Sequence, residues 1–323
     1  MKWRRWKKPF ARPSKTNTLN IETPILYKLR QSGELCHETV AGESGLRFLY
    51  QSPLGRLILE IFCKKPIFSA MMGLYQNSRL SRRDIPSFIE ALGIKMSEAQ
   101  KSGKDFKSFN EFFARKLKPE ARPIEADPSR LTLPADGRIL ALPVLEEKTE
   151  LPVKGAKLNL KQIIQDSSLY PSFLGGSALI VRLSPMDYHR FHWCFDGTPS
   201  KARRIAGHYY SVNPIAFPTR PELWSENERQ ITILSSETLG KVLQIEVGAT
   251  FVGKIIQSFA PEAPVSKGQE KGYFLFGAST VILIFEPKKI SLDPDLVSNT
   301  KIGYETLDFM GAGFATHKRN LCT

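Results

Sequence analysis

The sequence has little cysteine and no long apolar segment. Every stretch free of Asp, Glu, Lys and Arg is shorter than the ~20 apolar residues that a membrane-spanning helix requires. We therefore expect no transmembrane segment, and the basic N-terminus lacks the apolar run of a secretory signal. The four cysteines show neither metal-ligand nor redox spacing, which favours a reduced, cytosol-facing compartment. They are Cys36, Cys63, Cys194 and Cys322.

Acidic residues are few relative to basic ones. The chain of 323 residues has 46 Lys and Arg against 32 Asp and Glu, a formal net charge of +14. This balance predicts an anionic partner, which could be a membrane, a nucleic acid or a phosphorylated substrate. No RNA- or DNA-binding motif accompanies the basic residues, so we expect no nucleic-acid partner.

Residues 1–45 form a basic tail and lead-in. Residues 1–20 contain no acidic side chain, and Trp3, Trp6 and Phe10 lie among the basic ones. Basic clusters gain about 1 kcal/mol per charge near an anionic bilayer, and Trp favours the interface. A disordered, solvated tail would explain the same composition. The basic residues are Lys2, Arg4, Arg5, Lys7, Lys8, Arg12 and Lys15.

Residues 46–120 are predicted to form a helical, membrane-associating region. Five apolar residues between 54 and 62 fall on one helical face, and Pro66 suits the first turn of a second helix. Packing in a core would explain both stripes, but an apolar face rimmed by cations also suits a membrane interface, and we favour the latter. The stripes are Leu54, Leu57, Ile58, Ile61 and Phe62, then Ile67, Ala70, Met71 and Leu74.

The pattern changes along the next part of the chain. Ser108 and Glu111 form a possible capping box, which would start a helix with Phe109, Phe112 and Phe113 turned inward. From about residue 130, short apolar runs alternate with Gly and Pro, as in all-β proteins. We therefore predict an α+β protein in which the helical N-terminal region precedes a mainly antiparallel β domain at residues 121–323.

The stretch Gly272–Pro287 reads GYFLFGASTVILIFEP. Two apolar runs, Tyr273–Phe276 and Val281–Phe285, flank four small residues and are predicted to be buried strands. A tight turn or bulge in a core hairpin is the simplest interpretation. The alternative is a serine, Ser279, placed to attack its own backbone, because small residues permit the compact local geometry that this attack needs.

Two of the five histidines lie in one short stretch, Leu183–His192. His189 and His192 beside Asp187 would suit zinc, but no third ligand motif is present, so we expect no metal. In a strand or loop the two rings would face different ways, which implies separate roles. The other histidines have no such neighbourhood, and we interpret them as structural or exposed. They are His37, His208 and His317.

Gly277-Ala-Ser-Thr280 resembles the Gly-Ser-Thr self-cleavage motif of phosphatidylserine decarboxylases, which make their own pyruvoyl group. Ala278 stands where many members have glycine. The runs Asp187-Tyr-His-Arg-Phe-His192 and Pro134-Ala-Asp-Gly137 are similar to two further motifs of that family. The resemblance extends over most of the chain, from about residue 46 to 290. Weaker matches lie at residues 109–123, 153–160 and 210–214.

The resemblance implies a self-processing mechanism. Asp136 would orient His192, which would take the proton of Ser279 as the serine attacks the carbonyl of Ala278. Elimination and hydrolysis would leave a β chain of residues 1–278 and an α chain of residues 279–323 that begins with a pyruvoyl group. These two products would stay together as an α/β heterodimer, with or without further dimerisation.

The resemblance also implies the reaction that follows. Decarboxylation needs an electron sink, and the sequence shows neither a pyridoxal phosphate lysine motif nor a glycine loop that cradles phosphate. The pyruvoyl group would form a Schiff base with phosphatidylserine, and His189 would protonate the carbanion to give phosphatidylethanolamine. Asp187 would support processing, and Tyr188 and Asn213 are candidate substrate-binding residues.

The implied location is the cytoplasmic face of a bacterial cell membrane, where the protein would bind peripherally to the anionic surface. Two other classes stay open at this point. A pyruvoyl-dependent decarboxylase of a soluble amino acid would use the same serine without needing the cationic, amphipathic N-terminal third. A non-enzymatic membrane-binding β-domain would use the Gly-Ala-Ser-Thr run as a turn.

Overall fold

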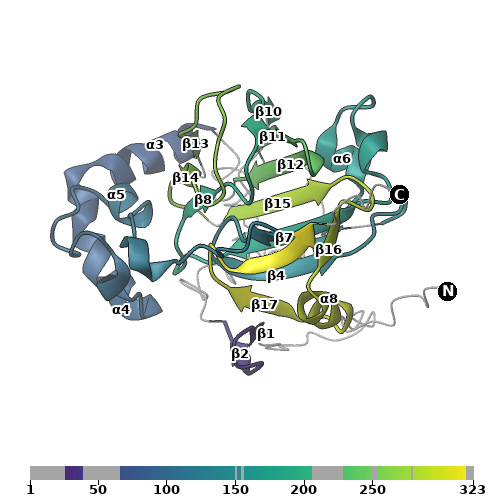
Figure 1. Ribbon diagram of the computed structural model, residues 1–323. Helices are drawn as coiled ribbons and strands as arrows, with labels where there is room; N and C mark the ends of the chain where they lie inside the picture. Colours follow the sequence, from purple (N-terminus) through teal and green to yellow (C-terminus); the bar gives the residue numbers. More distant parts are fainter. Residues whose placement is uncertain are drawn as a thin grey trace, which may run out of the picture.

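Strands dominate the chain between residues 130 and 317, and most of the helices precede them (Figure 1). The computed structural model describes residues 26–38, 66–149, 151–153, 156–205, 228–248, 254–277 and 279–317. The expectation of an α+β fold with mainly antiparallel sheets is confirmed. The predicted domain boundaries at residues 45/46 and 120/121 stay predictions.

One large sheet of ten strands forms the centre of the molecule. All its pairings are antiparallel except that between β1 and β17, which is parallel. Strand β9 (Thr198–Pro199) pairs with β11 off the main path. In spatial order the others are β10 (Arg203–Ile205), β11 (Arg229–Ser236), β12 (Gly240–Val247), β15 (Ser279–Phe285), β7 (Ser177–Leu183), β4 (Gly137–Leu142), β17 (Glu305–Asp308), β1 (Leu26–Leu29) and β2 (Leu35–His37).

The central strands β7 and β15 are buried along their whole length. Their side chains alternate between two cores, because successive residues of a strand point to opposite faces of the sheet. Leu283 and Phe285 enter one core, while Ile282 and Ile284 enter the other. Burial of each such side chain contributes about 1.5–3 kcal/mol. This two-sided burial explains why the sequence shows continuous apolar runs here rather than alternation.

Each face of the sheet is covered by other elements. Two three-stranded sheets supply Phe191, Phe274 and Phe314 to the first core, and helix α6 (Leu160–Ile164) covers the second. Helix α8 (Pro294–Lys301) packs against β4 and β17. A hairpin and a short 3-10 helix complete this part. The remaining elements are β13 (Ile255–Gln257), β14 (Glu270–Phe274) and β8 (Arg190–His192); β16 (Ile290–Leu292), β18 (Gly313–His317) and β3 (Arg130–Thr132); β5 (Leu151–Val153) and β6 (Ala156–Leu158); and η5 (Tyr170–Phe173).

The two apolar runs around Gly277 are strands, as predicted, but they do not form a hairpin. Strand β14 pairs with β13 and β8 in a small sheet, whereas β15 pairs with β12 and β7 in the large one. The interpretation of Gly277–Thr280 as a hairpin turn is therefore wrong. The chain crosses here from one sheet to the other, and Ser279 and Thr280 already belong to β15.

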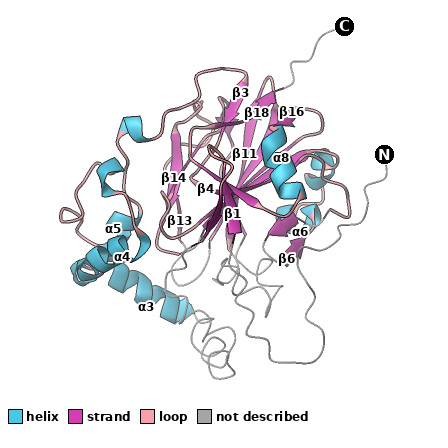
Figure 2. Cartoon of the chain, turned by 90° about the horizontal axis from the view of Figure 1, so that it is seen from below, coloured by secondary structure: helices cyan, strands magenta, loops and turns pink. Residues whose placement is uncertain are grey.

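The helices of the N-terminal third gather on one side of the strands (Figure 2). Ser108 caps α5 by accepting a hydrogen bond from the backbone N of Glu111 at 3.2 Å. Phe109, Phe112 and Phe113 are buried in a cluster shared with α4, as expected. The stripe predicted at residues 54–62 lies outside the described residues. The helices are α3 (Pro66–Asn77), η2 (Arg79–Asp84), α4 (Ile85–Leu92), η3 (Met96–Glu98), α5 (Phe109–Phe113) and η4 (Pro119–Ala121).

Helix α3 begins at Pro66, as predicted from the sequence. Two members of its apolar stripe are exposed: Met71 by 63% and Leu74 by 73%. These side chains therefore do not take part in core packing. Among the helices described, none is long and apolar enough to cross a membrane.

Gly137 is the first residue of β4 and lies against the backbone of β7. Its φ is +158°, and a Cβ atom there would lie 2.5 Å from the carbonyl oxygen of Arg182. We expect Gly137→Ala to lower the free energy of unfolding by roughly 1–3 kcal/mol or more, because backbone must move to accommodate the methyl group. Chemical denaturation measures the change. Gly103→Ala is the control, since its Cβ would meet only the end of the Ile89 side chain. Equal stability of the two variants would contradict the strand spacing described here.

Candidate active site

Ser279 is the first residue of β15 and is fully buried. Its Oγ donates a hydrogen bond of 3.3 Å to the carbonyl oxygen of Gly277. Gly277 has a φ of +151°, a conformation that residues with a side chain rarely adopt. The hydroxyl is thus folded back against the preceding backbone, which is the compact geometry expected from the small residues. Ala278 lies outside the described residues.

The segment around His189 lies beside the chain that leads to Ser279. Ser279 is paired with Leu183 at the end of β7, and the carbonyl of His189 accepts a hydrogen bond from the backbone N of Phe274 at 2.9 Å. The rings of His189 and Phe113 are 3.9 Å apart, and Phe113 also packs against Phe276. Helix α5, the His189 segment and the crossing chain therefore meet at one place.

His189 is fully buried and holds a fixed tautomer. Its Nδ1 lies 3.0 Å from the carbonyl oxygen of Asp187, and because a carbonyl only accepts, Nδ1 carries the proton. The other nitrogen, Nε2, is buried without a hydrogen-bond partner among the described residues. Burial, reinforced by the nearby Arg115, lowers the pKa of His189 to about 3. The imidazole is therefore neutral at neutral pH, with a free lone pair on Nε2.

His192 ends strand β8 and is 6% exposed. Its backbone N donates to the carbonyl of Pro134 at 2.7 Å, and its carbonyl accepts from Nε2 of Gln244 at 3.2 Å. The ring lies 5.7 Å from that of Tyr188, and its Nδ1 is also buried without a partner in the described part of the chain. Burial lowers the pKa of His192 to about 4. This second neutral imidazole can accept a proton.

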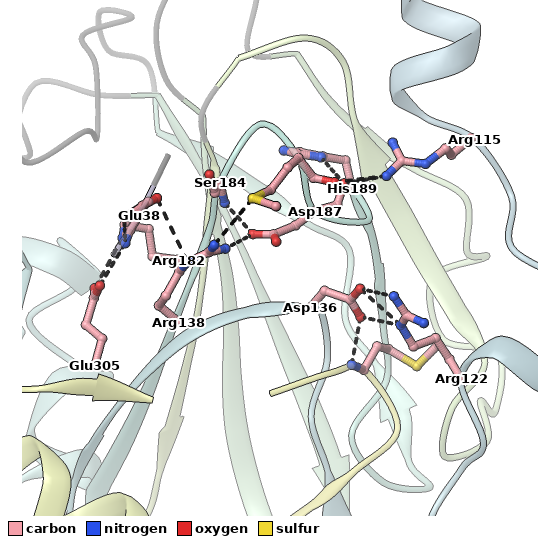
Figure 3. A network of polar contacts seen from close by, with 12 residues as sticks. Glu38, Arg115, Arg122, Asp136, Arg138, Arg182, Ser184, Asp187, His189 and Glu305 are labelled. Atoms are coloured by element: carbon pink, nitrogen blue, oxygen red, sulfur yellow. Dashed lines mark hydrogen bonds and ion pairs between the residues drawn. The ribbon is translucent and has the colours of Figure 1, made fainter. Parts of the chain in front are cut away.

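Asp136 lies between β3 and β4 and is 2% exposed. Its carboxylate accepts hydrogen bonds from Nε and Nη2 of Arg122, the shortest at 2.7 Å, and from the backbone N of Met310 at 2.9 Å (Figure 3). No hydrogen bond joins Asp136 to His192 among the described contacts. The two residues are linked only through the backbone, since Pro134 binds the N of His192. The predicted pairing of Asp136 with His192 stays a prediction.

Asp187 belongs to a buried network of charges (Figure 3). Its Oδ2 accepts a short hydrogen bond from Nη1 of Arg138 and one of 2.6 Å from the backbone N of Ser184. Arg138 is paired across the β4–β7 interface with Arg182, which in turn contacts the carboxylates of Glu38 and Glu305. The loop that precedes His189 is therefore fixed to the centre of the large sheet.

Comparisons with known proteins match this same part of the chain. The family model for phosphatidylserine decarboxylase matches residues 109–305. A phosphatidylserine decarboxylase proenzyme of Clostridium botulinum (strain 657) is 44% identical over 294 residues, 91% of this chain and 100% of the relative. Those of Clostridium perfringens (strain ATCC 13124) and Desulfitobacterium hafniense (strain DCB-2) are 46% and 47% identical, over 85% and 89% of this chain and 93% and 96% of the relatives. The chain belongs to the phosphatidylserine decarboxylase family.

The part matched by the phosphatidylserine decarboxylase model contains Asp136, Asp187, His189, His192 and Ser279. Tyr188, the candidate substrate-binding residue beside them, is 6% exposed, and burial raises the pKa of its hydroxyl. The other candidate, Asn213, lies outside the described residues. No group of three or more His, Cys, Asp or Glu side chains in the described ranges could hold a metal ion.

Four buried or partly buried arginines bind the loops and carboxylates of this site, and the sequence did not predict their roles. Arg138 and Arg182 interrupt the apolar runs of β4 and β7, and a charge in such a run is a signal of a buried partner. Arg115 and Arg122 both lie in the weaker family match at residues 109–123, for which the sequence predicts no catalytic role. The partners of the four arginines lie at very different separations, from 14 residues between Arg122 and Asp136 to 144 between Arg182 and Glu38. Sequence spacing cannot reveal such pairings.

Proposed function

We propose that this chain decarboxylates phosphatidylserine to phosphatidylethanolamine and CO2, using a pyruvoyl group that it makes from Ser279. The observation that carries the proposal is the buried Ser279, folded back on the backbone at the start of a central strand. The names of the relatives, which are phosphatidylserine decarboxylase proenzymes, support it. A pyruvoyl carbonyl supplies the electron sink that decarboxylation of an amine needs.

The residues that we assign to the site have chemistry that fits the formation of this group. Nδ1 of His192, Nε2 of His189 and Oγ1 of Thr280 are all buried without partners among the described residues. Unsatisfied buried polar atoms cost free energy and often mark a catalytic site. Both imidazoles are neutral, so either can act as a base on the serine hydroxyl.

For self-cleavage we assign the base to His192 and its orientation to Asp136. His192 takes the proton of Ser279 while Oγ attacks the carbonyl carbon of Ala278, so that an ester replaces the peptide bond and the amine of Ser279 is freed. Removal of the α proton of residue 279 then eliminates the carboxylate of Ala278 and leaves dehydroalanine. Water hydrolyses this residue to pyruvoyl and releases ammonia. Asp187 supports processing by holding the His189 segment on Arg138.

For decarboxylation we assign proton delivery to His189. Its Nδ1 is held by the carbonyl of Asp187, so Nε2 is the atom that can give or take a proton. Because its pKa is low in the free protein, His189 must gain a proton once the substrate is in place. The proposed substrate-binding residues are Tyr188 and Asn213.

The proposed products would remain one folded unit. Residues 279–323 contribute β15, which lies between β12 and β7, and β17, which lies between β4 and β1. They also contribute β18, which pairs with β3. The neighbours β12, β7, β4, β1 and β3 all come from the residues before the cut. This pairing supports an α/β heterodimer.

We further propose peripheral attachment to an anionic membrane at the cytoplasmic face of a bacterial cell. The exposed Met71 and Leu74 of α3 and the exposed Leu80 of η2 support an apolar contact. Arg82 and the largely exposed Arg83 lie in the same segment and supply positive charge. Such a combination suits the boundary between head groups and acyl chains.

Self-cleavage is tested on purified protein by denaturing gel and intact mass. The wild-type chain should give two products, residues 1–278 and residues 279–323, the latter blocked at its N-terminus by pyruvoyl. Ser279→Ala should give one full-length, inactive chain, because no hydroxyl is left to attack. Ser291→Ala, at an exposed position of β16, is the control and should still be cut after residue 278. An intact wild-type chain that decarboxylates phosphatidylserine would contradict the proposal, as would a free amino group on Ser279.

Variants of the two histidines should differ in cleavage on the same gel. His192→Ala should accumulate as one inactive chain, since a positioned base contributes about 10²–10⁴ in rate. His189→Ala should still split into two chains yet release CO2 from phosphatidylserine poorly. If His192→Ala matures while His189→Ala stays intact, the assignments are reversed. If both mature normally, neither histidine is the processing base.

Membrane attachment is tested with vesicles that contain anionic lipid. Replacing the five basic residues Lys2, Arg4, Arg5, Lys7 and Lys8 by Ala should weaken binding on the order of 1,000-fold or more at low salt, at about 1 kcal/mol per charge, and less at high salt. Met71→Ser with Leu74→Ser should weaken it at both. The control removes the same charge from exposed lysines elsewhere, and its unchanged binding would exclude a simple net-charge effect. Equal binding by the tail variant would remove the tail from this role. The control lysines are Lys116, Lys118, Lys148, Lys161 and Lys301.

A further inference from the structure

Arg115 is a buried guanidinium group beside the loop that precedes His189. It follows α5 directly and is 5% exposed. Its Nη2 donates to two carbonyl oxygens, those of Met186 and Asp187, both at 3.1 Å. Its Nη1 is buried and has no hydrogen-bond partner in the described part of the chain. One of the two terminal nitrogens of the guanidinium group is therefore without a hydrogen-bond acceptor.

Neighbouring buried arginines differ from Arg115 in having a carboxylate. Arg122 contacts Asp136, Arg138 contacts Asp187, and Arg182 contacts Glu38. No Asp or Glu forms an ion pair with Arg115 among the described residues. A buried cation without an anion is strongly unfavourable, so such a group is expected to have an anionic ligand. A purely structural role, in which Arg115 holds the loop at Met186 and Asp187, would explain the hydrogen bonds of Nη2. It would not explain why Nη1 is buried without an acceptor.

Arg115 and His189 are bound to the same backbone carbonyl, and each has one nitrogen without a partner. One carbonyl oxygen, that of Asp187, accepts from both Nη2 of Arg115 and Nδ1 of His189 (Figure 3). Each group then has one further nitrogen that is buried and unpartnered, Nη1 and Nε2. The charge of Arg115 also contributes to the low pKa of His189. An anion bound to Arg115 would cancel that charge and favour the imidazolium.

We propose that Nη1 of Arg115 binds an anionic oxygen of the substrate head group next to Nε2 of His189. This inference rests on the proposed function. Phosphatidylserine offers two such oxygens, on its carboxylate and on its phosphodiester, and a guanidinium group binds either. Binding does two things: it selects a charged head group, and it enables His189 to hold the proton that it delivers.

The test compares matured wild-type enzyme with matured Arg115→Gln, after a denaturing gel has shown that both have split. The assay follows CO2 release from phosphatidylserine in mixed micelles. We expect KM to rise on the order of 10–100-fold, as for the loss of a hydrogen bond to a charged group. Lys116→Gln, which removes the same charge from the next, exposed position, should retain the wild-type KM.

Inhibition by the product distinguishes the two anions. Phosphatidylethanolamine keeps the phosphodiester but has no carboxylate. If Arg115 binds the phosphodiester, Arg115→Gln weakens product inhibition as much as it raises KM. If Arg115 binds the carboxylate, KM rises and product inhibition is unchanged. A matured Arg115→Gln enzyme with the wild-type KM would overturn the inference.

A variant that does not mature still leaves a decisive measurement. If Arg115→Gln stays as one chain, Arg115→Lys takes its place. Lysine keeps the charge but presents a single nitrogen, which cannot serve both the loop carbonyls and a head-group oxygen. KM should again rise at least tenfold, and a wild-type KM would overturn the inference. Absence of CO2 release by the wild type would instead contradict the proposed function, so the two failures are distinct.

Discussion

Two guanidinium groups lie opposite each other in the middle of the large sheet, and the surrounding structure depends on their neutralisation. Arg138 and Arg182 are 1% and 3% exposed and are directly paired between β4 and β7. Three carboxylates offset them, and each comes from a different part of the chain: Glu38, Asp187 and Glu305. Removing one partner of such a buried pair typically costs 3–5 kcal/mol, because the remaining charge is left uncompensated. The network therefore fixes three parts of the chain relative to one another: the segment after β2 that contains Glu38, the loop before His189, and β17.

A second constraint is the burial of β15 on both faces. Hydrogen bonds to β12 and β7 and two separate cores hold this strand, so Ser279 at its beginning has little freedom to move. Gly277, two residues before it, has a φ of +151°, a conformation that glycine adopts readily. A nucleophile fixed on a rigid strand is well suited to one intramolecular attack.

The sequence alone predicted what depends on local pattern. The apolar runs of Val281–Phe285, the helix at Pro66 and the cap at Ser108 are all in the structure. It failed where the outcome depends on which strands pair, because two buried runs look alike whether they share a sheet or not. Thus a hairpin was the simplest interpretation of β14 and β15, whereas they lie in different sheets. The contact between Arg122 and the carboxylate of Asp136 likewise depends on the tertiary structure, which alone places that arginine beside it.

The pairing of β15, β17 and β18 with strands from the first 278 residues has a consequence for the lifetime of the protein. Before any cut, folding is a unimolecular search, and the ends of the crossing peptide are held together by the chain. Once Ser279 begins a separate chain, rebuilding the sheets would require two molecules to meet, to insert β15 and β17 between strands of the longer product, and to pair β18 with β3. The uncut chain can unfold and refold, whereas a cut one that unfolds loses its partner to dilution. Stability after the cut is therefore a matter of unfolding rate rather than of equilibrium, and each molecule folds into its working form only once.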